Sequence, residues 1–152
     1  MAADITKLRP KTQALCKLFI EACAKAGITV LITQTHRDST LQHAYFSQGR
    51  ESLAVVNANR AKAGLSELIA SDNKATITKA DAGQSPHEFD LAFDFVPVVN
   101  GKPDWNDLKL FDRCGAIGKT LNVDGFTLEW GGDFKSIKDK PHFQMKNWKN
   151  YK

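Results

Sequence analysis

Two separated groups of residues carry the side chains with which proteins bind a catalytic zinc ion. The first runs from Ser85 to Asp94 and contains His87, and the second runs from Asp139 to His142. Together they offer two imidazoles, one carboxylate ligand and a second carboxylate three residues before the last His. A catalytic zinc has three protein ligands and an open position, whereas a structural site adds a fourth ligand, commonly Cys. No Cys lies near either group, so the pattern predicts a catalytic site.

The spacing within the first group constrains where His87 lies. His87 and Asp94 are seven residues apart, which would place them on opposite faces of a regular strand. We therefore expect His87 in the turn that contains Pro86, with its ring folded back over the polar face of the following strand. Ala92 is small and leaves room on that face for a metal ion. Taken alone, a His near an Asp is more often a simple hydrogen-bonded pair, and only the second group favours a metal.

In the second group, Pro141 marks a bend or the start of an edge strand because proline has a fixed φ and no N–H. A bend there would let Asp139 lie over the metal. The alternative is that Asp139 is an ordinary surface carboxylate in a lysine-rich loop. Glu129 is the competing candidate for a general base, although it lies in an apolar segment.

Apolar and polar residues alternate most clearly between Glu88 and Val96, which predicts a strand with one core-facing side. The other expected elements are helices at Pro10–Ala26, from Asp38 or Ser39 to Gly49, at Ser52–Ala63 and at Trp105–Leu121, the last capped by Asp104 or Asn106, and strands at Ile28–Thr35, Phe126–Trp130 and His142–Met145. This order predicts one α+β domain over residues 1–152, with an antiparallel sheet packed against helices. Residues 51–84 form a long excursion, in which we expect a turn at Ser66–Ala70.

The composition is that of a globular domain, with 42% hydrophobic residues in 152 and no apolar run as long as a membrane span. A net charge of +4 suits anionic partners but does not choose between cell-wall polymers and nucleic acid. The three Cys are odd in number and far apart, which predicts free buried thiols and synthesis in a reducing cytoplasm. The N-terminal residues lack the pattern of a signal peptide, so we expect none.

The segment from Ser85 to Asp94 resembles the Ser-x-His-x-x-Gly-x-Ala-x-Asp signature of a family of zinc peptidases. The family comprises VanY-type D,D-carboxypeptidases and L-alanyl-D-glutamate endopeptidases, including many phage endolysins. Residues 130–144 are similar to the second block of the endopeptidase branch, and His36-Arg37 with Gln42 is similar to its arginine-containing segment. The resemblance runs from about the first helix to Gln144, which is nearly the whole chain, and it implies a hedgehog/D-Ala-D-Ala peptidase-like fold.

The resemblance also implies a role for each matched residue. One zinc ion per chain would be bound by His87, Asp94 and His142, with Asp139 as the general base and Arg37 as the stabiliser of the oxyanion. Substrate contacts would come from Ser85, Gln42 and Trp130, although a buried core position is equally expected for Trp130. One departure is Asp90, where the family has Gly. Asp90 either occupies a backbone position with φ > 0, which Asp tolerates better than most residues, or lies on the surface near the metal.

These implied roles lead us to expect a zinc endopeptidase that cleaves the L-Ala-D-Glu bond of the peptidoglycan stem peptide, as a phage endolysin. Such an enzyme would be monomeric, would bind neither nucleic acid nor membrane stably, and would act on the wall after leaving the host cytoplasm through a breached membrane. The alternatives are a D,D-carboxypeptidase that acts on D-Ala-D-Ala termini and a non-catalytic, zinc-stabilised module that binds the cell wall.

Overall fold

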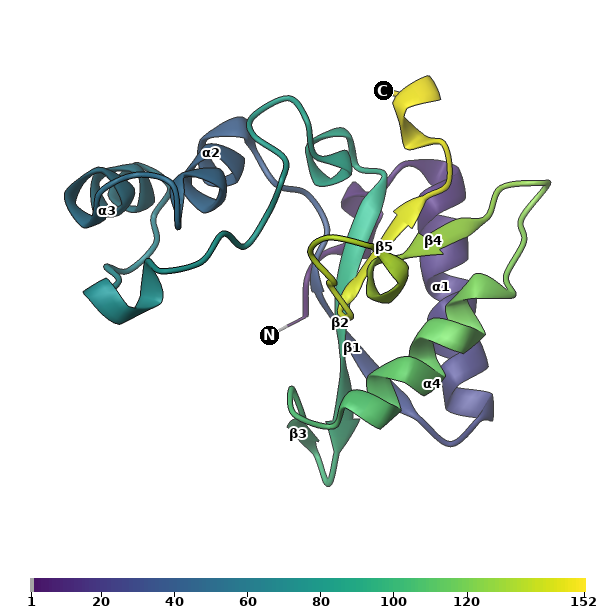
Figure 1. Cartoon of the computed structure of the whole chain (residues 1–152). Coiled ribbons are helices and arrows are strands. Elements are labelled where there is room, and N and C mark those ends of the chain that lie inside the picture. Colours follow the sequence, from purple (N-terminus) through teal and green to yellow (C-terminus); the bar gives the residue numbers. More distant parts are fainter. Residues whose placement is uncertain (1) are drawn as a thin grey trace.

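A computed structural model describes residues 2–152, in which helices pack against an antiparallel sheet (Figure 1). The strands are β1 (Thr29–Gln34), β2 (Ala92–Val99), β3 (Lys102–Pro103), β4 (Leu128–Trp130) and β5 (His142–Met145). Their order across the sheet is β1-β2-β5-β4, with β3 paired to β2. The predicted α+β class and its antiparallel sheet are confirmed.

The α-helices are α1 (Pro10–Lys25), α2 (Ser39–Ser47), α3 (Leu53–Lys62) and α4 (Leu108–Lys119). Short 3-10 helices occur at η1 (Ile5–Lys7), η2 (Ala70–Asp72), η3 (Pro86–Phe89), η4 (Gly131–Asp133) and η5 (Trp148–Asn150). Among the described residues, no helix combines the length and the apolar character needed to cross a bilayer.

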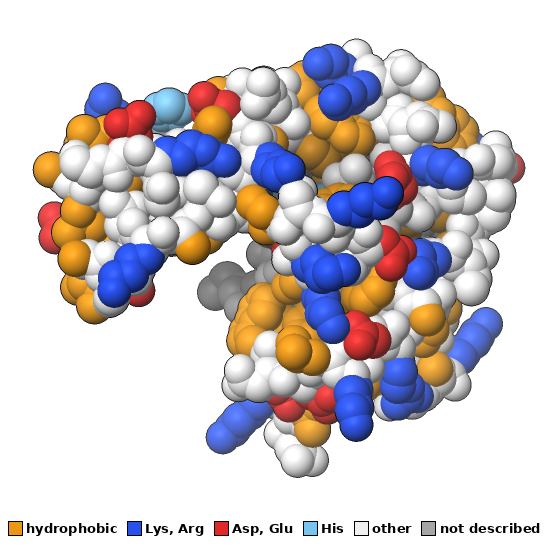
Figure 2. Space-filling view, in the orientation of Figure 1, with side chains coloured by type: hydrophobic (Ala, Val, Ile, Leu, Met, Phe, Trp, Pro, Cys, Tyr) orange, Lys and Arg blue, Asp and Glu red, His pale blue; other side chains and the backbone are white. Residues whose placement is uncertain are grey.

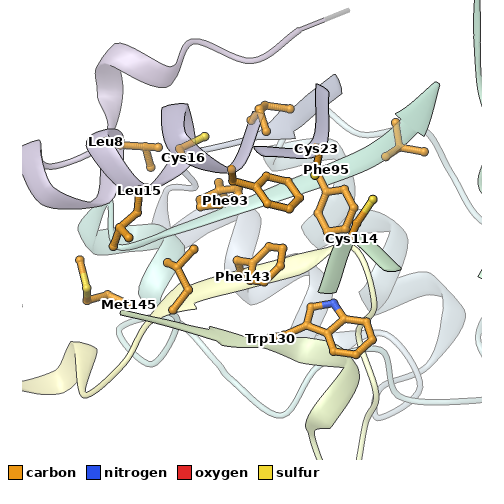
Figure 3. Close-up of a cluster of buried hydrophobic side chains, with 14 of the residues drawn as sticks. Leu8, Leu15, Cys16, Cys23, Phe93, Phe95, Cys114, Trp130, Phe143 and Met145 are labelled. Atoms are coloured by element: carbon orange, nitrogen blue, oxygen red, sulfur yellow. The ribbon is translucent and has the colours of Figure 1, made fainter. Parts of the chain in front are cut away.

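Helices α1 and α4 cover one face of the sheet and form the core with it (Figure 3). Phe19 of α1 is fully buried, and its ring lies 4.9 Å from both Phe95 of β2 and Phe143 of β5. The burial of such aromatic side chains stabilises the domain by removing large apolar areas from water. The core thereby holds β2 and β5 side by side.

The opposite face of the same strands carries the polar residues, because successive side chains of a strand point to opposite faces. Asp94 of β2 is paired in register with His142 of β5, next to the core pair Phe93 and Phe143. A β-bulge interrupts the pairing of β1 with β2, so that Gln34 lies opposite Asp94. Bulges commonly redirect a side chain next to a functional site.

The chain is not a strand over Glu88–Phe89, contrary to the prediction of a strand from Glu88. These residues belong to η3. The Ser85 side chain caps the start of η3 by accepting a hydrogen bond from the N–H of His87. The Glu88 carboxylate accepts one in return from the Ser85 N–H at 3.1 Å. This reciprocal capping stabilises a helical turn and therefore outweighs the alternation of apolar residues.

Two helix caps illustrate how local hydrogen bonds determine where helices α2 and α4 begin. The Asp38 carboxylate caps α2 by accepting from the Leu41 N–H at 2.8 Å, one of the two predicted arrangements. Helix α4 is capped by Asp107 instead of the predicted Asp104 or Asn106. Asp104 accepts from the N–H groups of the next turn, and the helix can start only after it.

The excursion contains the predicted third helix and then runs back along α2 (Figure 1). The turn expected at Ser66–Ala70 occurs later, as η2 at Ala70–Asp72. The side chain of Asn73 anchors this part by accepting from the Gly49 N–H at 2.6 Å and donating to the Glu51 carbonyl at 2.9 Å. The returning segment consequently passes close to the polar face of the sheet.

Candidate active site

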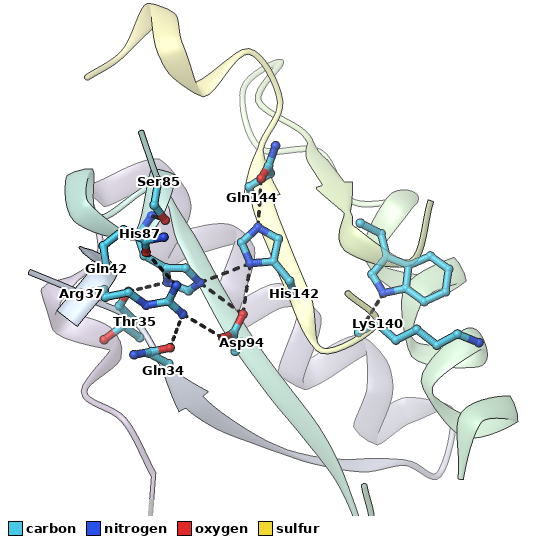
Figure 4. A network of polar contacts seen from close by, with 11 residues as sticks. Gln34, Thr35, Arg37, Gln42, Ser85, His87, Asp94, Lys140, His142 and Gln144 are labelled. Carbon is cyan, nitrogen blue, oxygen red and sulfur yellow. Dashed lines mark hydrogen bonds and ion pairs between the residues drawn. The ribbon is translucent and has the colours of Figure 1, made fainter. Parts of the chain in front are cut away.

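Three side chains converge on the polar face of the sheet (Figure 4). His87 Nε2 lies 3.2 Å from both Asp94 Oδ1 and His142 Nδ1, and these two atoms are 3.1 Å apart. They come from η3, β2 and β5, so the site exists only when the sheet is assembled. His87 lies in the turn before the strand, with its ring folded back over the sheet as the sequence predicted.

The triangle of ligand atoms has the dimensions of a zinc site. Zinc binds nitrogen and oxygen at about 2.0–2.2 Å, and tetrahedral geometry then separates the ligand atoms by about 3.3–3.5 Å. The observed separations of 3.1–3.2 Å are close to this range. Both imidazoles are buried and Asp94 is half-buried, so the donors fit the group that the sequence implied.

A second layer of hydrogen bonds orients both imidazoles. His87 Nδ1 donates to the backbone carbonyl of Thr35 at 2.8 Å, which leaves Nε2 free of a proton and facing the other two ligands. His142 Nε2 lies 2.9 Å from Gln144 Oε1 and leaves Nδ1 to face them. Such partners fix the ring orientation and the tautomer of metal-binding His residues.

The electrostatics of the three groups follow from burial and mutual attraction. Burial lowers the pKa of His87, because the charged imidazolium loses hydration. Burial opposes ionisation of Asp94, but the neighbouring imidazoles outweigh it and hold its pKa well below the usual range. Burial acts to lower the pKa of His142, but contacts with Asp94, Asp139 and Gln144 together outweigh it and raise the pKa. The site therefore keeps an ionised carboxylate between two nitrogen donors.

Arg37 lies beside the ligands and is held from two sides. Its Nη1 donates to Gln42 Oε1 at 2.9 Å, and its Nη2 donates to Gln34 Oε1 and lies 3.6 Å from Asp94 Oδ2. The NH₂ group of the Gln42 side chain donates to the Ala80 carbonyl at 2.6 Å. The guanidinium is thus a fixed cation directly next to the ligand set.

A cavity of about 580 Å³ opens over these residues. Its lining includes Arg37, Ser85, His87, Asp139 and His142. Asp139 is exposed at the mouth, and the surrounding protein raises its pKa by reducing the hydration of the carboxylate. Glu129, the competing base, does not line this cavity. Asp139 is therefore the carboxylate of this cavity that is placed to exchange protons with a ligand.

Two of the expected substrate contacts lie elsewhere. Gln42 is fully buried with both ends of its amide engaged, so it positions Arg37 and does not face the cavity. Trp130 is buried in the core, where its indole N–H donates to the Lys140 carbonyl at 2.8 Å. Of the three expected residues, only Ser85 lines the cavity, and its hydroxyl caps η3.

Asp90 takes the first of its two expected positions. Its φ of 62° places it in the left-handed region at the end of η3, where the family signature has Gly. Its carboxylate lies 2.7 Å from His36 Nδ1, and the Arg37 N–H donates to the His87 carbonyl at 3.2 Å. These contacts connect the loop of Arg37 to the turn of His87.

Three further residues of the site, namely Gln34, Thr35 and Gln144, were given no role from the sequence. Gln34 reaches Arg37 only because of the β-bulge, which no local pattern announces. Thr35 takes part through its backbone carbonyl, so its residue type carries no signal. Gln144 shares a face with His142 by the alternation of a strand, and this pattern places it beside the ligand without indicating a role.

Comparisons with known proteins indicate one family of peptidases. The D-alanyl-D-alanine carboxypeptidase family matches residues 78–145. The chain is 31% identical over 139 residues to the peptidoglycan L-alanyl-D-glutamate endopeptidase CwlK of Bacillus subtilis, covering 82% of this chain and 65% of CwlK. It is 28% identical over 149 residues to the L-alanyl-D-glutamate peptidase of Listeria phage A118, covering 98% of this chain and 41% of that protein.

The chain therefore spans somewhat less than two thirds of the first relative and about two fifths of the second. Among solved structures, the L-Ala D-Glu endopeptidase ChiX of Serratia marcescens superposes with a TM-score of 0.56 at 20% identity. That superposition covers 97% of this chain and 86% of ChiX. At this identity the likeness shows a shared fold.

Proposed function

The chain belongs to the family of D-alanyl-D-alanine carboxypeptidases and L-alanyl-D-glutamate peptidases, and we propose that it is a zinc-dependent peptidoglycan hydrolase. The proposed substrate is the stem peptide, and the proposed scissile bond joins L-Ala to D-Glu. The observation that carries the proposal is the meeting of three ligand atoms beside one cavity, which His87, His142, Asp139 and Arg37 line. The names of the relatives support this choice of bond.

The proposed cofactor is one zinc ion held by His87, Asp94 and His142. Two imidazoles and one carboxylate form a donor set that zinc accepts, and their separations fit its bond lengths. When bound, zinc supplies a Lewis acid for the scissile carbonyl and lowers the pKa of a water molecule.

Asp139 is proposed as the general base and, later, the general acid. Its carboxylate lines the cavity near His142, and no side-chain hydrogen bond to it occurs among the described residues. A free carboxylate can accept a proton from the attacking water and deliver it to the leaving amine. Its raised pKa favours the first transfer, because a carboxylate with a higher pKa is the stronger base and holds the accepted proton more firmly.

Arg37 is proposed to stabilise the negative charge that develops on the carbonyl oxygen. Its hydrogen bonds to Gln34 and Gln42 fix the guanidinium before substrate binds. A preorganised cation stabilises a developing charge without reorganisation during the reaction, which is where electrostatic catalysis gains most. Arg is suited to this role because it stays charged at all relevant pH values.

The biological role that we infer is that of a phage endolysin, a monomer that reaches the wall after a separate protein has breached the membrane. The similarity to the peptidase of a Listeria phage supports this role.

The test is to incubate the zinc-loaded protein with purified peptidoglycan and to identify the new termini by mass spectrometry. We expect new C-terminal L-Ala and N-terminal D-Glu, and no new termini with His142→Ala. Release of free D-Ala would instead identify a D,D-carboxypeptidase. Binding to peptidoglycan without any new terminus would identify a non-catalytic module.

A further inference from the structure

The cavity carries more positive than negative charge. Its lining includes three cationic side chains, Arg37, Lys79 and Lys135, but only one carboxylate, that of Asp139. The two lysines come from separate segments, one from the returning part of the excursion and one from the loop between β4 and β5. Lys and Arg side chains gather near the middle of the face that carries this loop (Figure 2).

The two lysines are the uncommitted cations of this cavity. Arg37 is already bound by Gln34, Gln42 and Asp94. Within residues 2–152, the lysines that form ion pairs are Lys11, Lys119 and Lys140. Lys79 and Lys135 are exposed, and neither has an acidic partner in this part of the chain. Their ammonium groups are therefore available to a ligand in the cavity.

The backbone of both lysines is anchored next to the ligand set. Lys79 precedes Ala80, whose carbonyl accepts a hydrogen bond from the amide that holds Arg37. Lys135 follows Phe134, whose ring lies 5.8 Å from the ring of His142. The flexible side chains of both lysines line the cavity from these positions, so their ammonium groups can approach an anionic group bound there.

We propose that Lys79 and Lys135 recognise the free carboxylate of the glutamyl residue at the scissile bond, so that the enzyme prefers the acid to the amidated substrate. The inference rests on the proposed function. A glutamyl residue has two carboxyl groups, and a peptide chain uses only one of them. The other is an anion unless it is amidated, and two unpaired lysines at the site complement it.

The test compares two stem peptides that differ only in this group, one with the carboxylate and one with the carboxamide. We expect the wild-type kcat/KM to be higher for the acid. Each of Lys79→Ala and Lys135→Ala should lower the acid-to-amide ratio of kcat/KM on the order of threefold, as for an exposed ion pair. The double variant should bring the ratio close to one.

Lys74→Ala and Lys138→Ala are matched controls, because each removes one exposed lysine of the same segment that does not line the cavity. They should retain the wild-type ratio. Cleavage of both peptides by the wild-type protein with equal kcat/KM would overturn the inference and leave the proposed function standing. So would an equal fall of the ratio in the control variants, which would indicate only a long-range effect of net charge. Failure to cleave either peptide would refute the proposed function, and the inference with it.

Discussion

At the scale of single residues, the main chemical feature is that two carboxylates, Asp94 and Asp139, have different roles. Asp94 is locked between two imidazoles and is kept ionised by them, which suits a metal ligand. Asp139 lies at the cavity mouth with a raised pKa, which suits a group that exchanges protons. Two carboxylates with pKa values driven apart by their surroundings are typical of acid–base catalysis.

We predict that Asp139→Asn abolishes most of the turnover while leaving the metal site intact. The amide has nearly the same shape but cannot accept the proton of the attacking water. General acid–base catalysis contributes about 10²–10⁴-fold, so kcat should fall by a factor in this range. Steady-state kinetics measures kcat, zinc analysis measures the metal content, and the melting temperature measures the stability of the fold. The metal content and the melting temperature should not change.

Glu129→Gln is the matched control for this prediction, because it removes a carboxylate that does not line the cavity. It should retain activity. Loss of zinc from Asp139→Asn would make Asp139 a ligand, and a loss of turnover in Glu129→Gln alone would move the base to Glu129.

The residues of the site were predictable from sequence to different degrees, and the reason is physical. His87, Asp94 and His142 stand out because metal ligands need particular residue types. Gln42 also stood out, but its role depends on burial, and burial is a property of the assembled fold. A polar side chain that holds another side chain in position, as Gln42 holds Arg37, produces no recognisable sequence pattern in its own segment.

At the scale of elements, helix α4 packs closely against β5 on the core side of the sheet, and this packing supports the site on the opposite face. A Cβ atom at Gly118 of α4 would lie 2.3 Å from the ring of Phe143. Phe143 follows His142 in β5, so the position of the metal ligand depends on this packing. The glycine is needed here for space and not for an unusual backbone conformation.

We predict that Gly118→Ala destabilises the fold. Overpacking a core typically costs about 1–3 kcal/mol, and the better helix propensity of Ala offsets about 1 kcal/mol of this. The free energy of unfolding in urea should therefore fall by up to about 2 kcal/mol. The Gly118→Ala/Phe143→Leu double variant provides the control, because the smaller side chain makes room for the methyl group. Its loss of stability should be less than the sum of the two single losses, and simple additivity would contradict the proposed clash.

The elements themselves were largely predictable, whereas their boundaries were not. Periodicity located the four α-helices and the four longer strands to within a few residues. The start of β2 was misplaced because the reciprocal hydrogen bonds of Ser85 and Glu88 favour a 3-10 turn over an extended chain. The choice between a 3-10 turn and an extended chain depends here on hydrogen-bond geometry, and the hydrophobic pattern carries no information about it.

At the scale of the whole molecule, the metal site connects parts of the chain that are distant in sequence. His87 lies in η3 after the excursion, Asp94 is in a central strand, and His142 is near the C-terminus. An unfolded chain does not hold these three side chains together. A metal ion that binds only the folded state therefore contributes its binding free energy to stability.

We predict that removing the metal lowers the melting temperature without unfolding the protein at room temperature. Zinc at about 100 times its dissociation constant would stabilise the fold by about 2.7 kcal/mol, which corresponds to roughly 5–10 °C in a chain of this size. The core of α1, α4 and the sheet contains no ligand and should persist in the apoprotein. Differential scanning calorimetry before and after chelation, followed by zinc addition, measures the shift and its reversal. In His142→Ala the same chelation should leave the melting temperature almost unchanged, because one of three ligands is missing. A wild-type melting temperature that does not respond to chelation, with zinc absent from the purified protein, would show that these three side chains do not form a metal site.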